Sequence, residues 1–291
     1  MIRLDTPADA NGTPYVAAEV YDLCIAKVRN PDRRARLAAI RAYVAIAADD
    51  FHAKATQANL HLVARTAEVA NVSKSELVGV YERMTQENND GRPVYDRIMI
   101  GATGERCPLC GMGQVKTLDH HLPQSHYTLL CVNPRNLVPA CRDCQSEKKA
   151  DYPKTRGTQT LHPYYDHYQN DIWLRAEVIQ GQSATFRYFV DQGAPFHHND
   201  IERLTEHVKV FGLAGRFSVR AAEELQDIRQ GLRKVFDAAQ AIGAAGATEV
   251  RSELEARTVS SEANLKNSWR SAMYRASMVS DWFCDGGFAQ T

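Results

Sequence analysis

The chain has 291 residues, a formal net charge of +0 and a hydrophobic content of 44%. These values are ordinary for a globular protein that is large enough to bury a substantial core. No apolar run approaches the roughly 20 residues that a membrane-spanning helix needs, and the first residues lack the apolar segment of a secretory signal. We therefore expect a cytoplasmic protein with no membrane partner.

The balanced charge excludes attraction of nucleic acid by the protein as a whole, so any such binding requires local basic surface. The segment 27–41 is one candidate, because it carries six lysine and arginine side chains against a single aspartate. The second candidate is the set of lysine and arginine residues within the cysteine-containing segment, from Arg106 to Arg156. For the segment 27–41, an ordinary solvated helix face is the alternative interpretation.

Most of the first 98 residues are predicted to be helical. A first helix is expected over 15–28, and Asn30-Pro31 has the residue types of a helix N-cap and first helical position. The following helical stretch is expected to continue to about residue 70. A capping box at Ser73-Lys-Ser-Glu76 begins another helix, and turn residues over 88–93 end it.

The middle of the chain has a different composition, rich in Cys, His, Pro and Gly. Because it has too few apolar residues to form a core of its own, we expect a bound metal ion to stabilise its fold. Beyond it, 171–180 and 184–190 alternate as strands, and helical periodicity returns from Asp200 with a small-residue break at 241–247. The sequence thus predicts an α+β protein. Its regions are an N-terminal helical region (1–98), a cysteine-containing core (99–168), a β-hairpin segment (169–199) and a C-terminal helical region (200–291).

Four of the seven cysteines form two C-x-x-C pairs, Cys107 with Cys110 and Cys141 with Cys144. An odd cysteine count without a secretory signal argues against a disulfide framework. Each pair can direct two thiolates at one tetrahedral ion, so together they predict a structural Zn²⁺ site with no open position for water. Buried free thiols are the alternative.

Between the two cysteine pairs lie Asp119, His120 and His121. Phosphodiester hydrolysis needs an activated water and a cation that stabilises the charge developing on phosphate. Histidine titrates near neutral pH, and carboxylate oxygens suit Mg²⁺. Neighbouring residues of a strand point to opposite faces, so a bend or twist is needed to bring Asp119 and His120 to one phosphate. A hydrogen-bonded structural pair beside the zinc is the alternative.

Three motifs carry a resemblance to a known family: Leu118-Asp-His-His-Leu-Pro123, Asn136-Leu-Val-Pro139 and Cys141-x-x-Cys144-x-x-x-Lys148. They resemble an HNH endonuclease of the His-Me finger, or ββα-metal, superfamily, whose zinc-bearing members carry two flanking C-x-x-C pairs. The resemblance extends from Cys107 to Asp166. It implies a ββα-metal core with the aspartate–histidine pair on the first strand, the asparagine at the loop and second strand, and the last ligand on the helix.

The resemblance also implies roles for individual residues. Asp119 would be a ligand of a catalytic Mg²⁺ or Mn²⁺, and His120 would be the general base that activates water. Asn136 would hold the loop and orient the base. Gln145 stands where the family usually has His or Asn as a second metal ligand, and its amide oxygen reaches one carbon farther than that of asparagine.

Three residues are accessory candidates. His121 is a candidate for substrate contact, His162 for support of the site, and Lys148 for contact with the phosphate backbone. Their alternatives are an outward-facing strand residue for His121, simple packing for His162 and a solvated helix position for Lys148.

The resemblance implies a metal-dependent endonuclease acting on DNA. The later His162-Pro-Tyr-Tyr-Asp166 resembles a subgroup in which an HNH core sits between helical flanks and is often encoded beside an ATPase in bacterial anti-phage systems. We therefore expect a defence role with an ATPase partner. No base-reading module is apparent, so contact with DNA is expected mainly through phosphates. The alternative is a zinc-stabilised module that binds nucleic acid or protein with weak or no catalytic activity.

Overall fold

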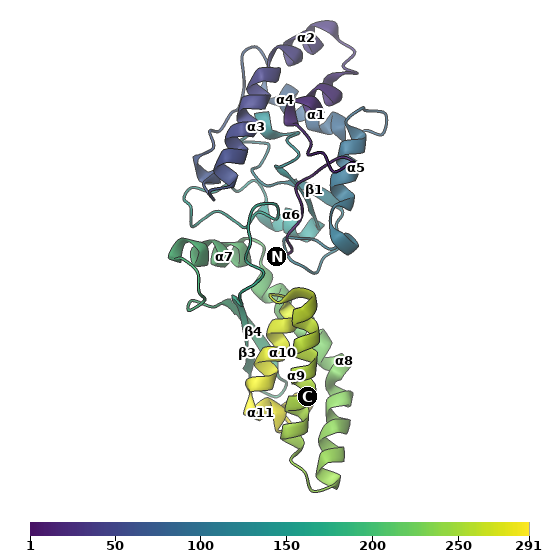
Figure 1. Ribbon diagram of the computed structural model, residues 1–291, viewed down its shortest axis with the longest axis vertical. Coiled ribbons are helices and arrows are strands. Elements are labelled where there is room, and N and C mark those ends of the chain that lie inside the picture. The colour runs from purple at the N-terminus through teal and green to yellow at the C-terminus, as the bar shows by residue number, and fades with distance from the viewer. Residues whose placement is uncertain (291) are drawn as a thin grey trace. The chain divides into compact units, whose positions relative to one another are not determined.

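The computed structural model describes residues 1–290 (Figure 1). The chain folds as two compact units, one formed by Ile2–Asp166 and one that runs from His167 to the end of the described chain. In both units the helices outweigh the strands, and each contains a two-stranded antiparallel sheet. The predicted α+β class is therefore confirmed. No helix formed by residues 1–290 combines the length and the apolar character that crossing a bilayer requires.

The first unit begins with a set of α-helices: α1 (Ala17–Ile25), α2 (Pro31–Ala39), α3 (Arg41–Ala55), α4 (Lys74–Met84) and α5 (Arg92–Ile100). Two predicted helix starts are confirmed. The Asn30 side chain accepts a hydrogen bond from the Arg33 N–H at 2.8 Å, as an N-cap does. Ser73 and Glu76 form the predicted reciprocal capping box at the start of α4.

The helix predicted to reach about residue 70 ends instead at Ala55. Ala58 adopts a positive φ of 53°, which no helix interior accommodates. Farther on, Thr66 pairs with a distant loop: its N–H donates to His126 O at 2.9 Å, and its carbonyl accepts from the Thr128 N–H at 3.2 Å. The prediction was wrong because these long-range backbone hydrogen bonds replace the helical ones, and helical periodicity carries no trace of them.

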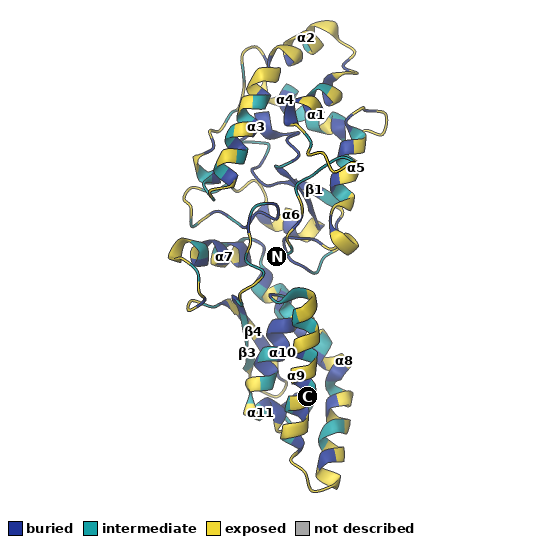
Figure 2. Ribbon diagram, in the orientation of Figure 1, coloured by how far each residue is buried: buried dark blue, intermediate teal, exposed yellow. Residues whose placement is uncertain are grey.

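The sheet of the first unit consists of β1 (Thr117–His120) and β2 (Leu137–Ala140), followed directly by α6 (Arg142–Lys148). Asp119 pairs with Val138 and His120 with Leu137. Strand β1 lies among buried residues (Figure 2), and α5 packs against both strands.

One hydrophobic cluster joins this sheet to the N-terminal helices. It contains Leu118 and Leu137 from the strands together with Val20 from α1, Val80 from α4 and Ile98 from α5. The structure therefore packs the N-terminal helices and the cysteine-containing segment together, in the unit Ile2–Asp166. The helices before residue 98 form the support on which the candidate site is built.

The second unit pairs β3 (Leu174–Ile179) with β4 (Thr185–Val190), which confirms the predicted hairpin. Its α-helices are α7 (His198–Val210), α8 (Leu213–Ala241), α9 (Gly246–Leu265), α10 (Trp269–Val279) and α11 (Asp281–Cys284). The predicted small-residue break lies between α8 and α9. A Cβ added at Gly246 would lie 2.7 Å from the Phe236 ring, so glycine permits close packing there.

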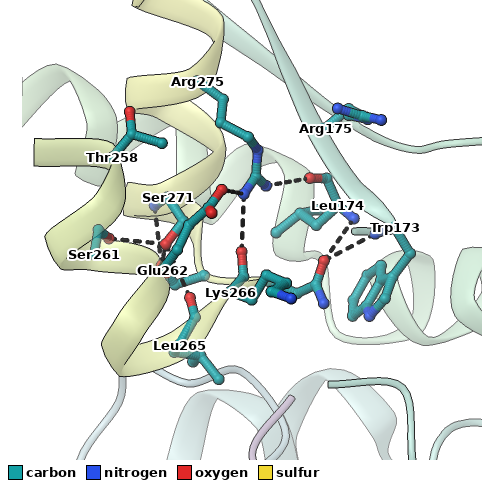
Figure 3. A network of polar contacts seen from close by, with 12 residues as sticks. Trp173, Leu174, Arg175, Thr258, Ser261, Glu262, Leu265, Lys266, Ser271 and Arg275 are labelled. Carbon is teal, nitrogen blue, oxygen red and sulfur yellow. Dashed lines mark hydrogen bonds and ion pairs between the residues drawn. The ribbon is translucent and has the colours of Figure 1, made fainter. Parts of the chain in front are cut away.

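A polar network fastens this hairpin to the helices (Figure 3). The Arg275 guanidinium pairs with Glu262 and donates hydrogen bonds to the carbonyls of Lys266 at 3.1 Å and Leu174 at 2.9 Å. The Asn267 side-chain oxygen accepts from the Leu174 N–H at 3.1 Å. Residues of α9, α10 and β3 are thus held by charge-assisted and backbone hydrogen bonds.

Candidate functional site

Four cysteines converge in the first unit, Cys107 and Cys110 from the segment before β1, Cys141 before α6 and Cys144 within it. Their sulfur atoms all lie within 4.8 Å of one another, and those of Cys110 and Cys141 are 3.8 Å apart. Four thiolates about 2.3 Å from a tetrahedral zinc would be separated by about 3.8 Å. Each cysteine is at most 4% exposed, so the donor set and its closure fit a structural Zn²⁺.

The turn after the first cysteine pair explains how the second pair comes so close. The Gly113 N–H donates to Cys110 Sγ at 3.3 Å, and the Gly113 carbonyl accepts from the Cys107 N–H at 2.7 Å. A Cβ at Gly113 would lie 2.7 Å from both Cβ and Sγ of Cys141. Any side chain there would displace one of the four sulfur atoms.

The Asp119 carboxylate, on β1, is directed at α6. Its Oδ2 lies 2.7 Å from Lys148 Nζ, and the two side chains are only 8% and 4% exposed. Lys148 also donates to the His120 carbonyl. Burial raises the pKa of Asp119, and the Lys148 ammonium opposes this shift. Lys148 thus clamps β1 to α6.

The His120 ring is held by backbone and aromatic contacts. Its Nε2 lies 2.8 Å from the Cys131 carbonyl, and its ring meets Tyr81 edge-on with centroids 4.4 Å apart. Since a carbonyl only accepts, Nε2 carries the proton and Nδ1 is the acceptor of the neutral ring. Burial lowers the pKa of His120 to about 4, with the Lys148 charge acting in the same direction and the Cys131 carbonyl against it. The ring is neutral near pH 7, which is the form that a general base needs.

The Asn136 side chain, which is fully buried, spans the loop between β1 and β2. Its Oδ1 accepts from the Leu122 N–H at 2.7 Å, and its Nδ2 donates to the carbonyls of Leu122 at 2.9 Å and Leu130 at 3.3 Å. Leu130 precedes Cys131, whose carbonyl contacts His120. Asn136 therefore fixes the loop backbone next to Cys131, and the Cys131 carbonyl in turn orients the His120 ring.

The Gln145 side chain lies on α6 but is exposed, and its Nε2 is 3.3 Å from Thr117 Oγ1. The structure brings Lys148, and not Gln145, to Asp119. Within residues 1–290, the cysteine cluster is the one group of three or more His, Cys, Asp and Glu side chains placed to share a metal. Asp119 Oδ2 is paired with the Lys148 ammonium and Gln145 Nε2 faces Thr117, and ligation of Mg²⁺ or Mn²⁺ by Asp119 and Gln145 stays a prediction.

The accessory histidines pack against each other. The rings of His121 and His162 have centroids 4.1 Å apart, and the two residues are 4% and 1% exposed. The Asp166 carboxylate accepts from the His162 N–H at 2.6 Å, and the Tyr164 hydroxyl donates to the Leu137 carbonyl at 2.8 Å. The segment after α6 is therefore anchored on β2 and supports the residue that follows His120.

Two partners of His120 were missed by sequence reasoning. Neither Tyr81 of α4 nor Cys131 was among the residues predicted for the site. Because the Cys131 contact is made by its backbone carbonyl, no residue type identifies it. The aromatic face next to His120 follows from the position of α4 in the fold, which a local pattern does not give.

Comparison with known proteins identifies the family of the chain. No protein-family model matches it, and no solved structure matches it significantly. Protein ea31 of Escherichia phage lambda is 31% identical over 235 residues, which are 75% of this chain and 76% of ea31. The chain belongs to the ea31 family.

Septu protein PtuB of Bacillus thuringiensis is a more distant relative of this ea31-family chain. It is 25% identical over 169 residues, which are 54% of this chain and 63% of PtuB. The match therefore spans just under two thirds of PtuB.

Proposed function

We propose that this member of the ea31 family is an HNH-type endonuclease that hydrolyses phosphodiester bonds of DNA. The observation that carries the proposal is the contact of His120 Nε2 with the Cys131 carbonyl at 2.8 Å, which leaves Nδ1 as the ring nitrogen that can accept a proton. The order β1, β2, α6, with Asp119 and His120 on β1 beside a four-cysteine cluster, supports a ββα-metal core.

In the proposed reaction, His120 Nδ1 accepts a proton from a water molecule while the water oxygen attacks phosphorus. The bond between phosphorus and the leaving oxygen breaks. Asn136 and Lys148 act as positioning residues, because one holds the loop that contacts His120 and the other holds the His120 carbonyl. A catalytic Mg²⁺ or Mn²⁺ remains a prediction from the resemblance, and no step is assigned to it because Asp119 is paired with Lys148.

Plasmid cleavage tests the catalytic assignment. Wild-type protein with added Mg²⁺ or Mn²⁺ should nick and linearise plasmid DNA, and His120→Ala should slow this by roughly 10²–10⁴-fold, the usual contribution of a general base. His198→Ala, at a histidine whose side chain is 86% exposed on α7, is the matched control and should cleave normally. Equal cleavage by wild type and His120→Ala would refute the assignment.

We further propose that the activity serves anti-phage defence together with an ATPase partner. The likeness to a Septu protein supports this, as does the resemblance of the HNH region to defence nucleases. The isolated chain should cleave plasmid DNA slowly, and co-expression with an ATPase of a Septu-type defence system should make cleavage faster. An unchanged rate with and without that ATPase would contradict the partnership.

The contacts of Gln145 and Lys148 favour one other candidate, a zinc-stabilised module that binds DNA without cutting it. Gln145 faces Thr117, and an ammonium group already neutralises Asp119. Wild-type protein that binds DNA, but cleaves none with any divalent ion or ATPase, would establish this second function.

A further inference from the structure

A concave surface of the first unit, well separated in sequence from the cysteine cluster, is lined by cationic side chains. It lies where the end of α1, the start of α2 and the end of α4 meet, and its volume is about 630 Å³. We call it the α1–α4 hollow. Lys27, Arg29, Arg33 and Arg83 line it together with four uncharged amide side chains and Val28. Among the described residues, no carboxylate belongs to this lining.

Nearby carboxylates neutralise only part of this charge. Lys27 pairs with Asp90 at 2.5 Å. Arg33 Nε is 3.8 Å from Glu76, but that carboxylate already lies 2.6 Å from Arg36. Two of the four basic side chains, Lys27 and Arg33, thus have a carboxylate neighbour, and Arg33 shares Glu76 with Arg36, which lies closer to it.

The other two cations have no carboxylate partner in the part of the chain that the structure describes. Arg83 donates to the backbone carbonyls of Lys27 at 2.7 Å and Cys24 at 3.3 Å, which fixes its guanidinium without neutralising it. Arg29 is exposed and makes no ion pair with any of residues 1–290. The α1–α4 hollow therefore keeps at least two positive charges, one of them held in place.

We propose that the α1–α4 hollow binds the phosphate backbone of duplex DNA. This inference rests on the proposed endonuclease function and adds a second point of contact with the substrate. Guanidinium groups match phosphate oxygens with parallel hydrogen bonds, and amide side chains donate to them as well. Because the hydrogen bonds to Lys27 and Cys24 already hold the Arg83 side chain, binding DNA would cost it less conformational entropy.

Helix α4 connects the hollow to the candidate catalytic histidine. Tyr81 of this helix packs on His120, and Arg83, two residues later, lines the hollow from nearly the opposite side of the helix. Both lie in one compact unit. A strand whose phosphate is bound in the hollow would therefore be held at a fixed distance from His120.

The test is a binding measurement that does not depend on cleavage. Fluorescence anisotropy with a labelled DNA duplex and no added divalent ion is measured in the His120→Ala background. Arg29→Glu should weaken binding about tenfold at 0.1 M salt and lower the slope of log Kd against log salt by about one. Arg34→Glu is the matched control, because Arg34 is exposed on α2 and does not line the hollow; its Kd should stay nearer to that of the background.

Equal losses for Arg29→Glu and Arg34→Glu, or no loss for Arg29→Glu, would overturn the inference. So would binding of poly-glutamate that depends on Arg29 as strongly, since the hollow would then select acidic peptides. Absence of DNA binding by the His120→Ala background also overturns it, while plasmid cleavage by wild type would leave the endonuclease proposal intact. Unchanged zinc content and circular dichroism verify that each variant is folded.

Discussion

Replacing Lys148 by methionine tests the buried contact between α6 and β1. Methionine keeps much of the side-chain volume but leaves the Asp119 carboxylate without its ammonium partner at 2.7 Å and the His120 carbonyl without its donor. Removing one partner of a buried ion pair costs about 3–5 kcal/mol. Since folded domains are stable by about 5–15 kcal/mol in total, this is a large share of the stability of the unit.

Urea denaturation of the zinc-loaded protein, followed by circular dichroism, measures the cost. All three tryptophans (Trp173, Trp269 and Trp282) lie beyond Asp166, so tryptophan fluorescence reports unfolding of the second unit and serves as an internal reference. We expect the circular dichroism transition of the first unit to move to lower urea in the Lys148→Met protein, while the fluorescence transition moves much less.

The matched control is Lys149→Met, at the next residue, which is exposed and should cost less than about 1 kcal/mol. A double variant, Asp119→Asn with Lys148→Met, should be more stable than Lys148→Met alone, because it leaves no buried charge without a partner. If Lys148→Met costs no more than Lys149→Met, the ion pair does not hold α6 to β1, and the reasoning fails.

Further predictions concern the zinc centre, the loop and the histidine. Metal analysis should find one zinc per chain, and Gly113→Ala should lower this content because its Cβ would lie 2.7 Å from Cys141 Sγ; full zinc occupancy would contradict the packing argument. Asn136→Ala should lower the unfolding free energy measured in urea by about 1–3 kcal/mol, because it leaves buried backbone groups unpaired; a cost within error of zero would show that the loop does not depend on them. Wild type should lose stability as pH falls from about 6.5 toward 4, because the unfolded chain then binds a proton that folded His120, with its pKa of about 4, does not; His120→Gln should lack this component, and parallel stability curves over pH 4–7 would refute it.

Local signals in the sequence predicted local structure well. The Asn30 cap, the capping box at Ser73 and the paired cysteines each depend on a few neighbouring residues, and the structure contains them. The hairpin of β3 and β4 follows equally from alternation around a short turn. In these places the conformation is determined by residues within the segment itself, so the local sequence is enough to predict it.

The candidate site depends on contacts that local patterns do not encode. His120 is oriented by a backbone carbonyl, and Lys148 reaches Asp119 across 29 positions of sequence. The helix that ends at Ala55 gives way to pairing between Thr66 and a loop about sixty residues later. Periodicity and motif spacing singled out Asp119, His120 and Lys148 as candidates but did not predict that Lys148 contacts Asp119 or that His120 contacts the Cys131 carbonyl.

The position of Lys148 on α6 has a consequence for metal supply. Lys148 follows Cys144 by four residues, so the two buried side chains lie on the same face of this helix, one turn apart. One end of that turn is tied to the sulfur cluster and the other to the strand that carries His120. A cell short of zinc would thus make chains in which α6 has lost its anchor and the histidine its alignment. If His120 is the general base that we propose, zinc availability would then control DNA cleavage through the fold of α6 and β1.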